Sequence, residues 1–285
     1  GTWCTQRVSV RTPHSPLCHT TSCLDTDLAV SSDPIMPTIN IGDAKLHYRI
    51  DDFSDPWESA ETILLHHGAG RHSGFWYRWI PLLSRQYRIL RFDARGHGLS
   101  SKPAPDHPWD LETLSDDVVR VLDALDLERV HYVGESAGGL IGLLAALDHA
   151  DRLSSLTLCG GLFRASRETQ QNLGAGGRDW LSSLAQMGQR EWVMHTMHTR
   201  VEAGKMSPGF STWYADESAR VPQYVMENMV RSVAATDLYD RLPDITIPTL
   251  ILAPEYSTVA PLRLQRIMRR RIPDSRLVVL KGYRH

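Results

Sequence analysis

The chain has 285 residues, of which 42% are hydrophobic and 22% are charged, with 31 basic against 33 acidic side chains. This composition is typical of a globular protein, long enough for one large α/β domain or two small ones. A formal charge of −2 offers no basic face to nucleic acid or anionic lipid. The longest apolar runs, such as residues 140–147, are too short to span a bilayer. We therefore expect a soluble, cytoplasmic protein with neither a nucleic-acid nor a membrane partner.

The first 35 residues differ from the rest of the chain. They are rich in Thr and Ser, have no acidic residue before Asp25, and lack the apolar segment of a secretory signal. We predict that residues 1–35 form a disordered leader, with organelle targeting as the alternative, and that the folded part begins near Met36. Beyond this leader the only cysteine is Cys159, which indicates a reduced interior rather than a disulfide scaffold.

From Met36 onward, short apolar runs alternate with helical patterns. Residues 38–41 and 45–50 predict a hairpin around a Gly-Asp turn, and residues 111–127 place apolar side chains on one face at helical spacing. The other predicted strands are residues 62–65, 87–92, 130–133, 155–159, 249–253 and 276–280. Strands bounded by helices predict an α/β protein with a mostly parallel twisted sheet and helices on both faces.

Residues 162–242 interrupt this alternation. They hold three tryptophans and six methionines, and we interpret them as a helical insertion between two strands of the sheet. Helices of this kind most often only pack a core, but an insertion over the carboxyl ends of strands can also wall a pocket. We expect a core made of residues 36–161 and 243–285, with residues 162–242 as a helical cap. The predicted substrate-binding residues are Trp180, Trp192 and Trp213.

The most specific motif is Gly-Glu-Ser-Ala-Gly at residues 134–138, between a predicted strand and an apolar helix. This is Gly-x-Ser-x-Gly in the strand–turn–helix setting that a nucleophile elbow requires. The turn is tight, so small residues must flank the serine, and its Oγ is left exposed at a helix N-terminus. The amide groups there favour a developing negative charge. We therefore predict Ser136 as a nucleophile rather than as part of a turn without function.

A second loop offers donors for an oxyanion. The predicted strand at residues 62–65 ends in His-His-Gly-Ala-Gly. Acyl transfer needs two donors aimed at the oxyanion, one from the residue after the serine and one from such a loop. The candidates are the backbone amides of Ala69 and Ala137, with His66 and His67 expected to orient the loop through hydrogen bonds.

The remaining polar motifs favour structural roles. Zinc ligation by His66, His67 and His72 is the weaker alternative, because no carboxylate-bearing metal pattern accompanies them. Asp93 and Arg95 follow a predicted strand in the tight loop Asp-Ala-Arg-Gly-His-Gly, and we expect both to be structural. No metal is predicted.

With these motifs in this order, the sequence from about residue 38 to 285 resembles the α/β-hydrolase superfamily. It is most similar to the small cofactor-free serine esterases and lactonases of the enol-lactonase and haloperoxidase-like type. The resemblance implies that Ser136 is the nucleophile. It also implies that His285, in the Gly-Tyr-Arg-His sequence after the last strand, is the general base.

The acid of the expected triad departs from the family pattern. Ser257 stands where the family usually has an aspartate, and Glu255 is the nearest carboxylate. Glu255 is therefore one candidate to orient His285, against an acid supplied from elsewhere in the fold or none. The superfamily normally continues past this histidine into a helix, so the motif order suggests a domain without its last helix.

Two classes of function follow. The first is a cofactor-independent serine hydrolase that cleaves a small, largely apolar ester or lactone through an acyl-enzyme on Ser136. Carbon–carbon bond hydrolysis uses the same Ser–His pair and stays open. The second is a non-catalytic or weakly catalytic ligand-binding member of the same fold, motivated by Ser257 in the acid position.

Overall fold

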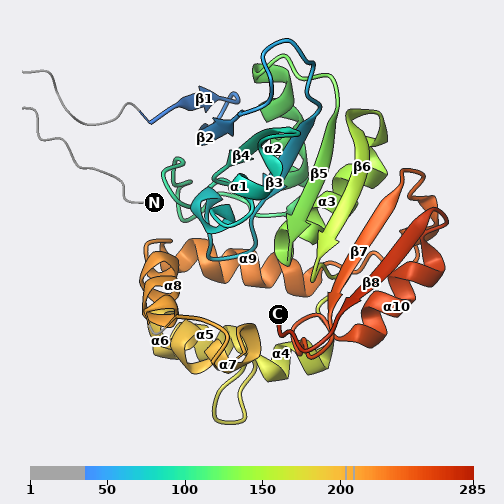
Figure 1. Cartoon of the computed structure of the whole chain (residues 1–285). Coiled ribbons are helices and arrows are strands. Elements are labelled where there is room, and N and C mark those ends of the chain that lie inside the picture. The colour runs from blue at the N-terminus through green and yellow to red at the C-terminus, as the bar shows by residue number, and fades with distance from the viewer. Residues whose placement is uncertain (1–35, 203, 208) are drawn as a thin grey trace, which may run out of the picture. The chain divides into compact units, whose positions relative to one another are not determined.

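The computed structural model of the protein describes residues 36–202, 204–207 and 209–285 (Figure 1). The predicted leader at residues 1–35 lies outside the described residues. The predicted hairpin is confirmed: β1 (Thr38–Asn40) and β2 (Lys45–Asp51) pair antiparallel. No helix in the described part of the chain is both long and apolar enough to cross a membrane.

The predicted strands join the hairpin in one sheet of order β1-β2-β4-β3-β5-β6-β7-β8. β2 runs antiparallel to β4, and every later pairing is parallel. The bounds of the six further strands are β3 (Thr62–His66), β4 (Arg88–Phe92), β5 (Val130–Glu135), β6 (Leu153–Cys159), β7 (Thr249–Pro254) and β8 (Ser275–Leu280). Because β3, β5, β6, β7 and β8 are parallel, their carboxyl ends meet at one edge of the sheet.

Helices cover both faces of the sheet, as predicted. Alternate residues of a strand point to opposite faces, and in β3 Leu64 enters the larger core while Ile63 and Leu65 enter a smaller one. The larger core includes side chains of α2 (Leu111–Ala124), α3 (Ala137–Asp148) and α10 (Leu262–Arg271). The smaller core is covered by η1 (Ser73–Trp76) and α1 (Ile80–Leu83). Short 3-10 turns are η2 (Ala150–Arg152) and η3 (Leu242–Asp244).

The burial of α2 and α3 follows from their sequences. In α2 the Asp110 side chain accepts a hydrogen bond of 2.6 Å from Thr113 N, which satisfies one free amide at the helix start. Its apolar stripe, including Val118 and Leu122, is fully buried. By contrast, α3 has apolar side chains on all sides, and it is therefore buried between the sheet and α2. This packing fixes the start of α3 directly after β5.

The segment between β6 and β7 is helical, as the sequence predicts. It contains α4 (Arg167–Asn172), α5 (Trp180–Met187), α6 (Gln189–His195), α7 (Met197–Arg200), α8 (Phe210–Ala219) and α9 (Gln223–Ala235). Figure 1 shows α9 crossing at the carboxyl ends of β5 and β6, with α5 to α8 beyond it. These helices therefore stand over the edge of the sheet where β5 delivers the Gly-x-Ser-x-Gly turn.

Charged groups inside the fold are paired where the loop after β4 packs on α2. Arg95 donates to Asp117 at 2.8 and 2.9 Å and to Asp43 at 2.7 and 3.0 Å. Asp93 accepts from the amides of Ser73 and Leu99, so Arg95 and Asp93 both have the structural contacts that the sequence suggested.

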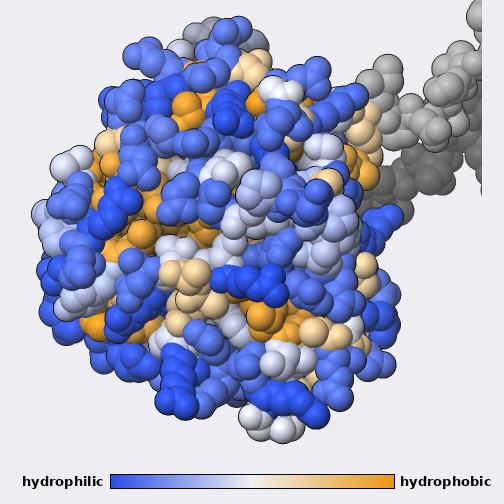
Figure 2. All heavy atoms as spheres, turned by 180° about the vertical axis from the view of Figure 1, so that it is seen from behind, coloured by the Kyte–Doolittle hydropathy of each residue, from blue (hydrophilic) through white to orange (hydrophobic). Residues whose placement is uncertain are grey.

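On the side of the molecule opposite to that in Figure 1, hydrophobic groups form separate patches among hydrophilic ones (Figure 2).

Candidate active site

The turn between β5 and α3 holds Ser136 in a strained conformation. Its φ is +53° and its ψ is −116°, a region that residues with a Cβ rarely adopt. Glycines permit the turn: a Cβ on Gly134 would lie 2.4 Å from the Gly138 carbonyl oxygen, and one on Gly138 would lie 2.6 Å from two backbone carbonyls. Strain of this kind persists only where the surrounding packing enforces it, and here it presents the Ser136 side chain at the first turn of α3.

His285 meets this serine. Its Nε2 lies 2.9 Å from Ser136 Oγ, although the two residues are 149 positions apart in the sequence. The His285 side chain is only 1% exposed. The structure thus brings together the two residues for which the resemblance implied nucleophile and base.

The other ring nitrogen of His285 faces Ser257 and not a carboxylate. Ser257 Oγ lies 3.1 Å from His285 Nδ1 and accepts a 2.9 Å hydrogen bond from the amide of Ala260. Glu255, the carboxylate considered for this role, is directed elsewhere. Its Oε2 accepts from Gly282 N at 2.8 Å and thereby ties the loop that carries His285 to the end of β7. Ser257, which stands where the family usually has an aspartate, is therefore the residue that contacts His285.

The loop after β3 lies against the turn that carries Ser136. Ala69 and Ala137 line the same small cavity as Ser136. The amide of Ala137 is the first of α3, so no carbonyl within the helix can accept it. In the loop, the turn is closed by a bond from Arg71 N to Gly68 O, which does not involve the Ala69 amide.

Two histidines hold this loop, as expected. His67 Nδ1 lies 2.8 Å from Gly68 O, and its Nε2 accepts from Ala94 N at 2.9 Å. His66 Nδ1 bonds the hydroxyl of Tyr132, which donates to Gly138 O at 2.7 Å. Burial lowers the pKa of His66 to about 3, so the ring is neutral at pH 7. No cluster suited to a metal ion is found within the residues that the structure describes.

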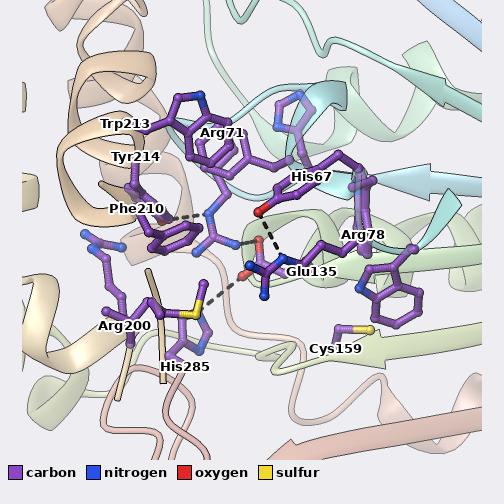
Figure 3. Close-up of a pocket in the computed structure, with 16 residues that line it drawn as sticks. His67, Arg71, Arg78, Glu135, Cys159, Arg200, Phe210, Trp213, Tyr214 and His285 are labelled. Carbon is purple, nitrogen blue, oxygen red and sulfur yellow. Dashed lines mark hydrogen bonds and ion pairs between the residues drawn. The ribbon is translucent and has the colours of Figure 1, made fainter. Parts of the chain in front are cut away.

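Three charged residues at the site were missed by the sequence reasoning. Glu135, inside the Gly-x-Ser-x-Gly motif, forms an ion pair with Arg71 Nη1, and its Oε1 lies 3.6 Å from His285 Nε2. Arg71 also donates to Tyr214 OH at 2.7 Å, and Figure 3 shows it between Tyr214 and Glu135. Arg200, at the end of α7, lines the same space. The only signals in the sequence were positional: Glu135 directly precedes Ser136, and Arg71 directly follows the His-His-Gly-Ala-Gly loop.

Burial and these charges together determine the protonation state of His285. Burial lowers the pKa of His285 well below its usual range, and the positive charges of Arg71 and Arg200 lower it further. The imidazole is therefore neutral at pH 7, the form that can accept a proton. Burial raises the pKa of Glu135, an effect that Arg71 and Arg200 partly offset. Burial also raises the pKa of the nearby Cys159 thiol to about 12, so this group stays protonated.

Two cavities adjoin the Ser136–His285 pair. A cavity of about 40 Å³ is lined by Ser136 and by apolar side chains that include Trp180 and Trp192. A larger one, of about 250 Å³, is lined by His285 and by an aromatic group that includes Trp213 (Figure 3). Each of the three tryptophans predicted to bind substrate therefore lines one or the other of these cavities. Arg71 and Arg200 line both and form their common wall.

Known proteins share this arrangement of fold and sequence. Residues 61–285 match the model of the alpha/beta hydrolase fold family. The chain is 30% identical over 234 residues to "Putative carbamate hydrolase RutD" of Caulobacter vibrioides, covering 81% of this chain and 84% of that protein. It is 28% identical over 226 residues to 3-oxoadipate enol-lactonase 1 of Acinetobacter baylyi, covering 78% of this chain and 81% of that protein.

A solved structure agrees with these relatives. The crystal structure of the enol-lactonase from Burkholderia xenovorans matches with a TM-score of 0.77 and 26% sequence identity, covering 87% of this chain and 92% of that one. The chain belongs to the α/β-hydrolase fold family and is an α/β hydrolase. The resemblance noted in the sequence is confirmed at this level.

Proposed function

We propose that the protein is a cofactor-independent serine hydrolase that cleaves a small ester or lactone through an acyl-enzyme on Ser136. The observation that carries this proposal is the 2.9 Å contact between Ser136 Oγ and His285 Nε2, at a serine held in a strained turn. A nucleophile and a base within hydrogen-bond reach are the minimum that acyl transfer by serine requires. The enol-lactonase names among the relatives support a lactone or ester as substrate.

The first half of the reaction forms the acyl-enzyme. Ser136 Oγ attacks the carbonyl carbon while its proton moves to His285 Nε2. The negative charge that develops on the carbonyl oxygen is stabilised by the amides of Ala69 and Ala137. When the tetrahedral intermediate collapses, the bond to the leaving oxygen breaks and that oxygen takes the proton from His285. With a lactone, the new hydroxyl stays attached to the acyl group.

The second half releases the product. A water molecule gives a proton to His285 Nε2 and attacks the acyl carbon, again with the oxyanion facing the two amides. Collapse of this intermediate breaks the bond to Ser136 Oγ, and His285 returns the proton to that oxygen. The products are a carboxylic acid and a free serine, so the cycle consumes one water.

Ser257 gives this mechanism a distinctive weakness. For His285 Nε2 to accept a proton, the ring hydrogen must sit on Nδ1, and Ser257 Oγ must then act as an acceptor. A hydroxyl can accept or donate, so Ser257 selects this tautomer less strongly than a carboxylate would. It also provides no negative charge to stabilise the imidazolium. We therefore place Ser257 as a positioning residue that supports slower turnover than an aspartate would.

An activity-based probe tests the proposal. A fluorophosphonate, which modifies only activated serines, should label the wild-type protein and fail to label Ser136→Ala. The matched control is Ser166→Ala, because Ser166 also precedes a helix but has its hydroxyl engaged with Thr169 rather than a histidine. That variant should label like the wild type.

The outcomes separate the functions considered. Labelling that survives Ser136→Ala would remove Ser136 as the nucleophile. A wild-type protein that takes no label would overturn the hydrolase proposal and favour the non-catalytic, ligand-binding function. A labelled protein that cleaves carbon–carbon bonds but no ester or lactone would retain the mechanism and overturn the substrate class.

A further inference from the structure

The charges around the Ser136–His285 pair do not balance. Among the described residues, Arg71 and Arg200 line both cavities, and Glu135 is the one acidic side chain in either lining, on the larger cavity. Arg78 also lines the larger cavity, but it is exposed to solvent and so is not counted among the enclosed charges. The histidine between them is neutral. The enclosed site therefore carries one excess positive charge, and protonation of Glu135 would only increase it. Uncompensated charge is costly to enclose, so an excess at a cavity wall points to an anion that binds there.

Arg71 has little capacity left for a ligand. Its Nη1 pairs with Glu135 Oε2, and its Nε donates to Tyr214 OH at 2.7 Å. Glu135 Oε2 in turn accepts from Gly68 N at 3.1 Å, which ties the pair to the oxyanion loop. Arg71 thus holds Glu135 in contact with the loop after β3, and contributes mainly its positive charge, rather than free hydrogen-bond donors, to the cavities.

Arg200 is the free member of the pair. Its Nη2 donates to Thr196 Oγ1 at 3.2 Å, and its guanidinium stacks 5.0 Å from the ring centroid of Trp192. Its Nε is fully enclosed but has no hydrogen-bond partner among the described residues, and no described acidic side chain forms an ion pair with it. An enclosed guanidinium without a carboxylate is a binding element for an anion.

We propose that the substrate is an ester or lactone that bears a carboxylate, and that Arg200 binds this carboxylate with Arg71 adding its charge. The inference rests on the proposed function and replaces the largely apolar substrate that the sequence suggested. A carboxylate carries the single negative charge that balances the excess, whereas a phosphate monoester carries up to two. The apolar lining of the small cavity then holds the uncharged part of the molecule.

The test uses two pairs of esters that differ in charge and little in shape. One pair is mono-4-nitrophenyl glutarate and 4-nitrophenyl valerate, with the carboxylate on the acyl side. The other is 3-acetoxybenzoate and 3-acetoxybenzamide, with the carboxylate on the leaving group. In the wild type, kcat/KM for at least one anionic ester should exceed that of its neutral partner by roughly 10- to 100-fold, as expected for hydrogen bonds to a charged group.

Variants of Arg200 identify the source of the preference. Arg200→Gln should abolish it by lowering kcat/KM for the anionic ester alone, while Arg200→Lys, which keeps the charge, should retain part of it. Arg190→Gln is the matched control, because Arg190 lies on the same cap but pairs with Asp216 at the surface. Ser136→Ala reports the uncatalysed background of each ester.

Each result bears on one proposal. Hydrolysis of both pairs with no preference for the anion in the wild type, or a preference that survives Arg200→Gln, would overturn the inference and leave the serine mechanism standing. If Arg200→Gln does not fold, the wild-type ratio and the Arg200→Lys variant still decide the question. Absence of both hydrolysis and fluorophosphonate labelling would instead overturn the proposed function itself.

Discussion

Two arginine clusters in this protein have opposite charge balances. At the packing of α2 against the β1–β2 hairpin, Arg95 and Arg120 meet Asp43 and Asp117, so two positive groups face two negative ones. Beside Ser136, two enclosed guanidinium groups, of Arg71 and Arg200, face the single carboxylate of Glu135. The first cluster is complete within the protein and therefore serves the fold. In the second cluster, the charges balance only when an anionic ligand binds. The balance of enclosed charges can therefore help to distinguish a binding site from a structural network.

Two buried histidines, His67 and His285, show a similar contrast between a structural and a functional environment. His67 has both ring nitrogens bonded to backbone groups, which fixes its tautomer and leaves it nothing to exchange. His285 is bonded on both sides to serine hydroxyls, Ser136 and Ser257, which can each donate or accept. Burial lowers the pKa of both rings. Burial and a low pKa are therefore shared by structural and functional histidines, and the chemistry of the partners distinguishes them.

The largest effect on stability is expected in the balanced cluster. Asp117→Ala leaves the buried Arg95 guanidinium with half of its partners, and we expect a loss of about 3 kcal/mol in the free energy of unfolding. Urea denaturation measures it, and Asp116→Ala is the control. Asp116 is adjacent but half exposed, so its loss should cost less than about 0.5 kcal/mol. Similar losses for both variants would contradict the structural role assigned to the Arg95 cluster.

The next largest effect is expected on kcat, at Ser257. Ser257→Ala should lower kcat by about tenfold, and Ser257→Asp should raise it by about tenfold or more, because a carboxylate fixes the tautomer and stabilises the imidazolium. In the wild type, the lowered pKa of His285 keeps the base neutral as the pH falls, so the acid limb of kcat/KM should lie below pH 6.5. The negative charge of Ser257→Asp raises this pKa and should move the limb to higher pH.

A purely structural Ser257 would produce a different pattern. Its variants would change the melting temperature while the acid limb stayed in place. An Asp variant with an unchanged limb and an unchanged kcat would therefore remove Ser257 from the contact with the base.

A smaller effect tests the charge excess through stability. Arg200→Gln removes an enclosed charge that lacks a carboxylate partner, so we expect the free energy of unfolding to rise by about 1 kcal/mol, opposite in sign to Asp117→Ala. The melting temperature of the ligand-free protein measures it, with Arg190→Gln as the exposed control. A marked loss of stability in Arg200→Gln alone would show that this arginine belongs to the fold.

The smallest effect is expected at Glu255. Its carboxylate accepts from the Gly282 amide and makes no contact with His285 among the described residues. The amide oxygen of Glu255→Gln can accept the same bond, so kcat should change by less than about twofold, since no charged group at the reacting atoms is altered. A strong loss of kcat in this variant, with an unchanged melting temperature, would restore Glu255 as the acid of the site.

The sequence by itself determined the parts of the protein that depend on neighbouring residues. Strands, the α2 helix and the turn at residues 134–138 are recognisable because each needs a short local pattern: alternation, helical spacing, or glycines where backbone atoms approach within a Cβ's reach. The order of these motifs, read through the family resemblance, also placed Ser136 with His285.

Only the tertiary structure decided which charged and polar groups meet. Glu255 and Ser257 are two residues apart, and the bend of the loop alone directs one to Gly282 and the other to His285. Glu135, Arg71 and Arg200 come from β5, the loop after β3 and the cap, so no local spacing relates them. Ion pairing acts through space over a few ångströms. For that reason the excess charge of the site becomes visible only when the cap is packed over the sheet.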